Sequence, residues 1–240
     1  MKHALHTTLL LLLCTGTFIS CSDDPTGPVD ELDIPVAYAF ESRFVSGESS
    51  VAYGGQTVRN LLVQDLKLAI DALGKPGASS VELDELLALY DHIDAANLST
   101  ITPTGQLPAL TTSFSAISTG KNLSGKISPA ILANHTQSAD AQIRAWLDSV
   151  ARFSNDPARL GTPMAYTTDA GLDLAQLINK VLLGSVVYYQ GTSVYLAGLL
   201  DRDNSAQKDG TRPYTDMEHA FDEAFGYYGA ARNYSQFSDG

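Results

Sequence analysis

Apolar residues recur at three- and four-residue steps in several stretches of the chain, and this spacing predicts amphipathic helices. The first such run covers residues 56–73, and Gly74 with Pro76 then ends it. A second helix is expected in SSVELDELLALYDHI, residues 79–93, where Ser79 and Glu82 have the spacing of a capping box. A third is expected over Ser138–Phe153, with four apolar side chains facing inward: Ile143, Trp146, Leu147 and Val150.

The longest apolar stretch is LDLAQLINKVLLGSVVYYQGTSVYLAGLL, residues 172–200. It has no charged residue between Lys180 and Asp201, a length that would span a membrane. Its tyrosines, glycines and hydroxyl residues make it too polar for a confident span, so it predicts the buried central helix of a bundle. Gly184, Gly191 and Gly198 fall seven residues apart, which predicts close packing by a neighbouring helix.

Little in the rest of the chain suggests strands. Only SVAY, residues 50–53, shows a short extended pattern, and residues 97–128 are rich in Thr, Ser, Gly and Pro. Such a composition predicts a long irregular segment. The expected fold class is therefore all-α: a helical bundle with a long buried central helix and an irregular mid-chain loop.

The last predicted helix is TDMEHAFDEAFGYYG, residues 215–229. Thr215 and Glu218 have capping-box spacing, and Asp216 suits the positive end of the helix dipole. On a helical wheel the apolar residues occupy one arc: Met217, Ala220, Phe221, Ala224, Phe225, Tyr227 and Tyr228. The opposite arc holds Glu218, His219, Asp222, Glu223 and Gly226. The simplest expectation is that this acidic arc faces solvent.

The acidic arc also predicts a metal site. His219 stands three residues before Asp222 and four before Glu223, a spacing by which two side chains can share one metal ion. Glu218, His219, Asp222 and Glu223 are therefore candidate ligands of a divalent metal or iron. An alternative partner for the carboxylates is Arg59 in GGQTVRN, which would form a structural ion-pair network with them.

The charge of the protein excludes some partners. Asp and Glu number 27 against 15 Lys and Arg, which gives a formal net charge of −12. Nucleic acid binding calls for a basic surface, and so does purely electrostatic binding to anionic lipid. We expect neither.

The N-terminus predicts a lipid anchor. A basic start and the apolar run LLLLLCTGTFIS precede Cys21, which resembles a bacterial lipoprotein signal over residues 1–20. Cys21 would then be lipidated and hold the protein on a membrane. The alternative is an ordinary secretory signal that ends near a chance cysteine. Residues 21–35 are acidic and proline-containing, which predicts a tether, and the helical domain would follow at 36–240. The acidic residues directly after Cys21 resemble the surface-export signals of Bacteroidetes lipoproteins, and this resemblance implies an outer-membrane protein that is periplasmic or surface-exposed.

Three motifs resemble one family: YGGQTVR, LINKVLLGSVVYYQGTSVYL and DGTRPYTDMEHAFDEAFGYYG. They resemble domain-of-unknown-function family 4856, bacterial lipoproteins similar to the imelysin-like helical proteins. The resemblance implies an imelysin-like bundle, a link with iron uptake, and a His-x-x-Glu motif that here contains His219 and Asp222, with Asp replacing Glu. Family members continue past the end of this chain, so the resemblance also implies a bundle that is incomplete at its C-terminus.

Three functions follow as hypotheses. The first is a non-catalytic, lipid-anchored binding protein that takes up iron, another metal or a small ligand. The second is a metallopeptidase in which His219 and Asp222 bind zinc and Glu223 or Glu218 acts as the general base. The third is a structural or interaction lipoprotein with a solvated acidic helix.

Overall fold

The computed structural model describes residues 40–92 and 118–229. The predicted signal sequence, Cys21, the tether and most of the irregular segment lie outside these ranges. Within them the chain forms helices and isolated β-bridges but no strand, which confirms the all-α class, and the SVAY segment is not a strand. The α-helices are α1 (Gly54–Ala72), α2 (Leu83–Asp91), α4 (Ala139–Ser154), α5 (Leu174–Leu182) and α6 (Asp216–Tyr228). Short 3-10 helices are η2 (Ser124–Lys126), η3 (Pro163–Ala165), η6 (Leu199–Asp201) and η7 (Lys208–Gly210).

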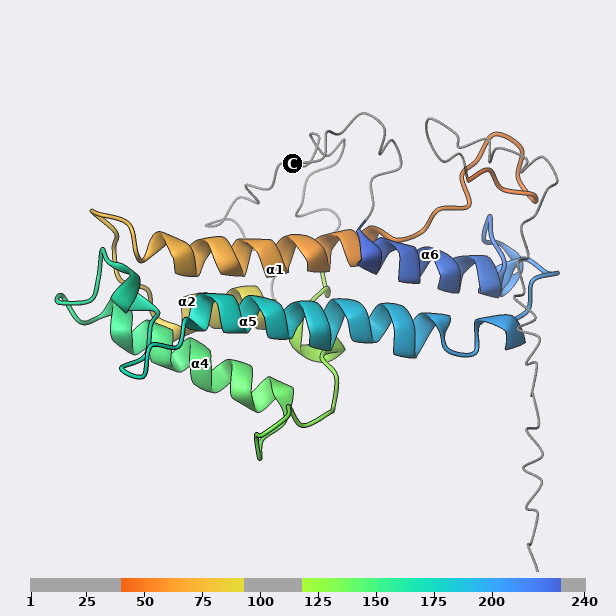
Figure 1. Ribbon diagram of the computed structural model, residues 1–240. Helices are drawn as coiled ribbons and strands as arrows, with labels where there is room; N and C mark the ends of the chain where they lie inside the picture. The colour runs from red at the N-terminus through yellow and green to blue at the C-terminus, as the bar shows by residue number, and fades with distance from the viewer. Residues whose placement is uncertain (1–39, 93–117, 230–240) are drawn as a thin grey trace, which may run out of the picture. The chain divides into compact units, whose positions relative to one another are not determined.

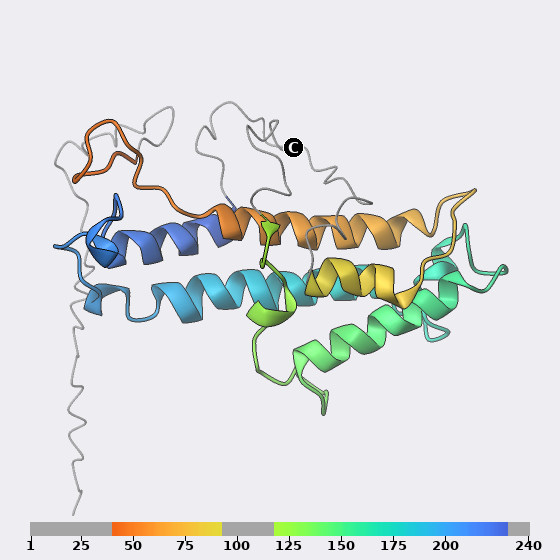
Figure 2. The ribbon, with the colours of Figure 1, turned by 180° about the vertical axis from the view of Figure 1, so that it is seen from behind.

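The long helix that begins as α5 organises the described part of the chain. It continues as two π-helical stretches, η4 (Leu183–Tyr188) and η5 (Gln190–Leu196). Helix α1 packs along its first half and α6 along its second half, so α1 and α6 follow one another along the same side (Figure 1). Helices α2 and α4 pack against each other, α2 also against α1 and α4 also against α5 (Figure 2).

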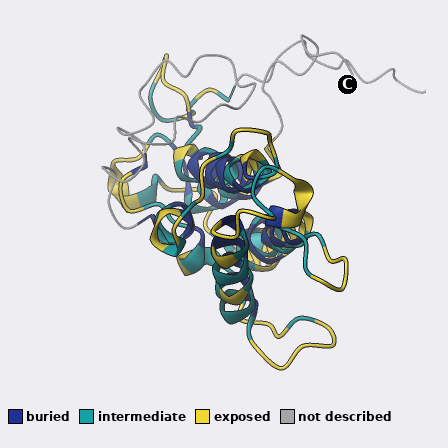
Figure 3. Cartoon of the chain, turned by 90° about the vertical axis from the view of Figure 1, so that its left-hand side faces the viewer, coloured by how far each residue is buried: buried dark blue, intermediate teal, exposed yellow. Residues whose placement is uncertain are grey.

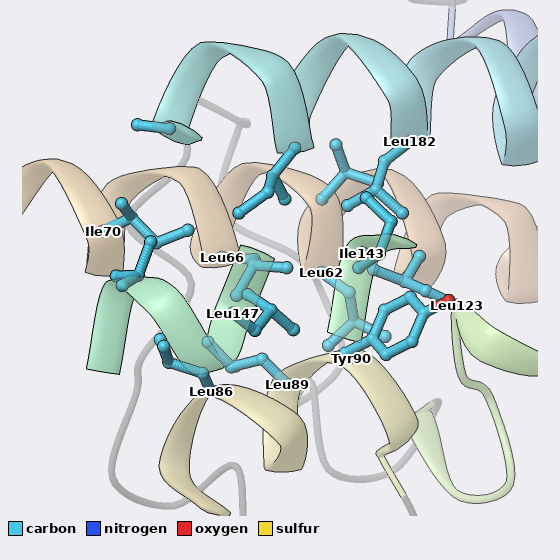
Figure 4. Close-up of a cluster of buried hydrophobic side chains, with 14 of the residues drawn as sticks. Leu62, Leu66, Ile70, Leu86, Leu89, Tyr90, Leu123, Ile143, Leu147 and Leu182 are labelled. Carbon is cyan, nitrogen blue, oxygen red and sulfur yellow. The ribbon is translucent and has the colours of Figure 1, made fainter. Parts of the chain in front are cut away.

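One apolar core joins α1, α2, α4 and α5 (Figure 4). Leu66 and Ile70 of α1 are fully buried in it, as are Ile143 and Leu147 of α4. The predicted inward face of α4 is confirmed at these positions, whereas Trp146 is only partly buried. Viewed by exposure, the buried residues lie on the facing sides of the helices (Figure 3). This burial of apolar area is the main stabilising term of such a bundle.

The long helix departs from the buried central helix that its composition predicts. Only one side of it is buried, and Tyr188 on the other side is 69% exposed. The second half of the helix is π-helical, so side chains there do not recur with the α-helical period on which the expected packing of the glycines depends. Gly191 packs against α6, Gly184 faces open space, and Gly198 lies beyond the helix with a φ of +70°.

The helix starts show how local sequence sets the boundaries. Thr215 and Glu218 form the predicted capping box. Helix α2 begins later than expected, at Leu83, because the Glu82 amide donates to the Glu85 side chain at 2.8 Å and Ser79 takes no part. Across the described ranges, no helix is both long and apolar enough to cross a bilayer.

The C-terminal end of α6 meets the start of α1 at Gly226. A Cβ atom on this glycine would lie 2.5 Å from Tyr53 Cβ and 2.9 Å from Gln56 Cβ. Both distances are shorter than carbon atoms tolerate, and the opposing atoms are close to the backbone and cannot move alone. The absent side chain is therefore what allows the two helices to approach so closely.

Gly226→Ala is expected to destabilise the protein by about 1–3 kcal/mol or more, since the new methyl group forces the α1–α6 contact apart. Gly184→Ala is the matched control, because it is also a helical glycine but has no atom within 4 Å of its Cβ position. It should be neutral or stabilise by up to about 1 kcal/mol. Urea unfolding measures both, and equal stability of the two variants would refute the packing role of Gly226.

Candidate functional site

Two acidic residues in the first turn of α6, Asp216 and Glu218, have mainly structural roles. Thr215 Oγ1 accepts a hydrogen bond from the Glu218 amide at 3.1 Å, and Glu218 Oε2 accepts one from the Thr215 amide at 2.8 Å. Glu218 Oε1 also accepts from Arg43 Nε at 2.9 Å, a partner that the sequence pattern did not reveal. Asp216 forms ion pairs with Lys208 and Arg202, which lower the pKa of its carboxyl group.

Asp222 contradicts the expectation of a solvated acidic arc. It is only 5% exposed, and its Oδ2 accepts a hydrogen bond from the Ala52 amide at 3.1 Å. Burial raises the pKa of Asp222 to about 6, helped by repulsion from Glu218 and Glu223 and opposed by the Ala52 bond. The helical wheel also predicted that the whole apolar arc is buried, and this is wrong because Phe221 and Tyr228 are exposed. Helix α6 is packed on two sides, against η5 on one and against α1 with the preceding Ala52 and Tyr53 on the other.

His219 and Glu223 come together on the other side of α6. His219 Nε2 lies 3.6 Å from Glu223 Oε2, and the His219 ring stacks on Tyr214 at 4.8 Å between centroids. Burial lowers the pKa of His219 more than Glu223 raises it, so the imidazole is neutral at pH 7. Its Nδ1 is buried without a hydrogen bond. Glu223 Oε1 accepts from Gln56 Nε2 at 3.0 Å, which ties the pair to α1.

The four candidate ligands therefore do not form one group. Glu218 caps α6, Asp222 accepts a hydrogen bond from the Ala52 amide, and His219 lies next to Glu223. Within residues 40–92 and 118–229, no group of three or more His, Cys, Asp or Glu side chains is placed to hold a metal ion. The four-residue metal site stays a prediction, and the His219–Glu223 pair is the part of it that the structure brings together.

Arg59 is buried and forms no salt bridge with these carboxylates. Its Nε donates to the Asn122 carbonyl at 2.9 Å and its Nη1 to the Gly55 carbonyl at 3.1 Å. It is 6% exposed. The hydrogen bonds of Arg59 thus give no support to its interpretation as the direct counter-charge of the acidic arc.

A groove of about 570 Å³ lies beside α6, and we call it the arm groove because one wall is the segment 40–53 that precedes α1. Two of the predicted site residues, Glu218 and Asp222, line it. The remaining lining residues are Phe40, Glu41, Arg43, Ser50, Leu199, Asn204, Met217 and Phe221. The groove thus joins apolar walls to a set of carboxylates.

Comparison with known families adds one finding. The profile described as "Domain of unknown function (DUF4856)" matches residues 35–238. The chain belongs to the DUF4856 family. Neither the curated proteins nor the solved structures gave a significant match. The family resemblance of the three motifs is therefore confirmed for this DUF4856 protein, and the imelysin-like relationship stays an expectation.

Several residues that contact the acids of α6 were not predicted from the sequence. Arg43, Ala52, Gln56 and Tyr195 all contact or neighbour acids of α6 that lie far away along the chain. Gln56 stands in the YGGQTVR motif, which was a signal that this segment matters but not of what it contacts. The backbone amide of Ala52 carries no signal in the sequence at all.

Asp222→Asn tests the burial of the carboxylate in this DUF4856 protein. Because the folded-state pKa is raised from 3.8 to about 6, the folded protein binds a proton that the unfolded chain lacks between about pH 4 and 6. The charged form thus lowers the free energy of unfolding above about pH 6. Asparagine keeps an oxygen for the Ala52 amide and has no charge. We expect Asp222→Asn to be more stable than wild type at pH 7.5, with the difference shrinking towards pH 4 in urea unfolding.

Asp216→Asn is the control of opposite sign. Its ion pairs lower the pKa of Asp216, so its stabilising contribution is present above the ordinary Asp pKa and is lost only below it. Asp216→Asn should be less stable than wild type throughout this pH range. A pH-independent difference for Asp222→Asn would contradict the buried, charged carboxylate.

Proposed function

We propose that this protein is a lipid-anchored binding protein of the cell envelope that takes its ligand in the arm groove. The observation that carries the proposal is the groove itself, where a 5% exposed carboxylate meets four apolar side chains of the arm, η6 and α6. A pocket with apolar walls and a few placed polar groups is typical of small-molecule sites. The predicted lipoprotein signal with Cys21 supports the anchor and the envelope location.

The charges of the groove point to the class of ligand. Glu41, Glu218 and Asp222 face one cation, Arg43, which Glu218 already engages. A cationic group would offset the repulsion among these carboxylates. Phe40, Leu199, Met217 and Phe221 offer apolar contact to the rest of the ligand. The groove therefore suits a small organic cation with an apolar body.

Metal acquisition is the second candidate, and one observation favours it. His219 Nε2 and Glu223 Oε2 are 3.6 Å apart, and His219 Nδ1 is buried without a hydrogen bond. A neutral imidazole beside a carboxylate is a pair that divalent metals and iron bind. Stoichiometric metal in the purified protein that is lost from a His219→Ala/Glu223→Ala variant would favour this function over the organic cation, because neither residue lines the arm groove.

Three probes of one shape test the groove: phenethylamine, 2-phenylethanol and phenylacetate, titrated by calorimetry into the full-length protein in detergent. We expect the cation to bind most tightly and the anion least, because the groove carries excess negative charge. Glu218→Gln should weaken phenethylamine binding several-fold while keeping the capping-box acceptor. Glu85→Gln, which alters the equivalent cap on α2, is the matched control and should bind like wild type. Equal binding of the three probes, or none, would refute the organic-cation proposal.

The anchor has its own test. Cys21→Ser should abolish incorporation of a labelled fatty acid and move the protein from the membrane fraction to the soluble fraction, since the acyl chains supply the membrane affinity. Cell fractionation with metabolic labelling measures both effects. Membrane association that persists in Cys21→Ser would contradict anchoring at this residue without touching the ligand proposal.

A further inference from the structure

Three cations gather at the start of α1 without a carboxylate partner. Seven of the 13 described Lys and Arg residues form salt bridges, and Arg59, Lys121 and Lys126 are among the six that form none. Arg59 Nη1 and Lys121 Cε each lie 3.2 Å from the position that a Cβ on Gly55 would take. The pKa of Lys126 is lowered by burial and then by repulsion from Arg59 and Lys121. Such a group is unexpected in a protein of net charge −12.

Nearby acids do not neutralise this group. Glu223 is the carboxylate that attracts Lys126, but it forms no salt bridge with Lys or Arg and already contacts Gln56 and His219. The sequence from residue 95 to 120, which leads into Lys121, contains no charged residue. A local excess of positive charge therefore remains.

The N-terminal end of α1 adds to this excess of positive charge. Its N-cap residue Tyr53 makes no capping hydrogen bond with its side chain, and the first turn contains no acidic residue. The first two helical residues are Gly54 and Gly55, and the lack of a side chain at Gly55 lets the Arg59 and Lys121 side chains approach the backbone. The amides at such a helix start attract anions.

Two buried oxygen atoms nearby, the Tyr227 hydroxyl and Gln190 Oε1, lack a hydrogen bond of regular geometry. The Tyr227 hydroxyl lies beside the Arg59 guanidinium but makes no hydrogen bond of regular geometry, and the residue is 1% exposed. Gln190, 6% exposed, donates from Nε2 to the Lys126 carbonyl at 2.7 Å and leaves its buried Oε1 without a donor. Buried polar atoms are nearly always hydrogen-bonded, so these two oxygens can each form a hydrogen bond with a ligand at little desolvation cost.

We propose that these residues form a binding site for the carboxylate or phosphate of a small hydroxylated ligand. We call it the junction site and define it by Arg59, Lys121, Lys126, Gln190 and Tyr227. The cations and the Tyr227 hydroxyl bind the anionic group, which suits charge-assisted hydrogen bonds. Gln190 Oε1 accepts a hydrogen bond from a hydroxyl of the ligand. The junction site shares no residue with the arm groove, so it stands whether or not the arm groove binds a cation.

Calorimetric titration of the full-length protein in detergent at low salt tests the site, with inorganic phosphate, glucuronate and glucose as probes. Phosphate or glucuronate should bind, whereas uncharged glucose should not. Tighter binding of glucuronate would identify the source as a hydroxylated carboxylate, and tighter binding of phosphate a phosphorylated ligand. Absence of binding by both anions would overturn the proposal.

Tyr227→Phe separates a binding role from a structural one. Because the hydroxyl has no regular hydrogen bond, its removal should leave the urea unfolding midpoint unchanged or raised. Anion affinity should nevertheless fall about tenfold, which corresponds to the loss of one charge-assisted hydrogen bond. Unchanged anion affinity in this variant would overturn the proposal.

Lys126→Gln gives the charge test, and Lys180→Gln, an exposed lysine of α5 without a salt bridge, is its matched control. Lys126→Gln should weaken anion binding about tenfold, while Lys180→Gln should remain within about twofold of wild type. Equal losses in the two variants would show a general effect of net charge and would also overturn the site.

Discussion

The close contact between Gly226 of α6 and the start of α1 is the constraint on which the candidate sites depend. Without a side chain at Gly226, Tyr53 and Gln56 come within a distance that any other residue would prevent. Asp222 and Glu223 lie about one turn before Gly226 on the same helix, and the contact brings them to the Ala52 amide and the Gln56 side chain. A glycine that costs helical stability is here the condition for the packing.

The π-helical winding of the long helix complements this contact. A π-helix places side chains at a different period from an α-helix, and such stretches are frequent at functional sites. On η5, Gln190 is directed to the Lys126 carbonyl, Gly191 lies against the α6 backbone, and Tyr195 stacks on Tyr227 at 6.0 Å between centroids. Two of the residues that made this segment unlike a membrane span, Gly191 and Tyr195, contact α6.

Sequence patterns predicted the helices better than their surroundings. Periodicity and capping residues act locally, so α4 and the start of α6 were placed to within about a residue. The predicted exposure of α6 was wrong because a helical wheel assumes one buried side. In the structure Asp222 and Gly226 are also covered, by a segment about 170 residues earlier in the sequence. The candidate acids were recognised by type and spacing, but their separate partners, Arg43, Ala52 and Gln56, depend on tertiary packing that spacing does not encode.

The two proposed sites lie on two sides of one turn of α6. Asp222 lines the arm groove, while the next residue, Glu223, faces the cations at the start of α1. Successive residues project about 100° apart on a helix, so a single turn separates a negative groove from a positive cluster.

Opposite charges held this close interact through a partly desolvated interior, where screening by salt is weak. An anion at the junction site would make the groove more negative and would raise the affinity of the groove for a cation, and the effect must be reciprocal. The arrangement is therefore suited to a ligand pair, or to one ligand with both charges, more than to two independent occupants.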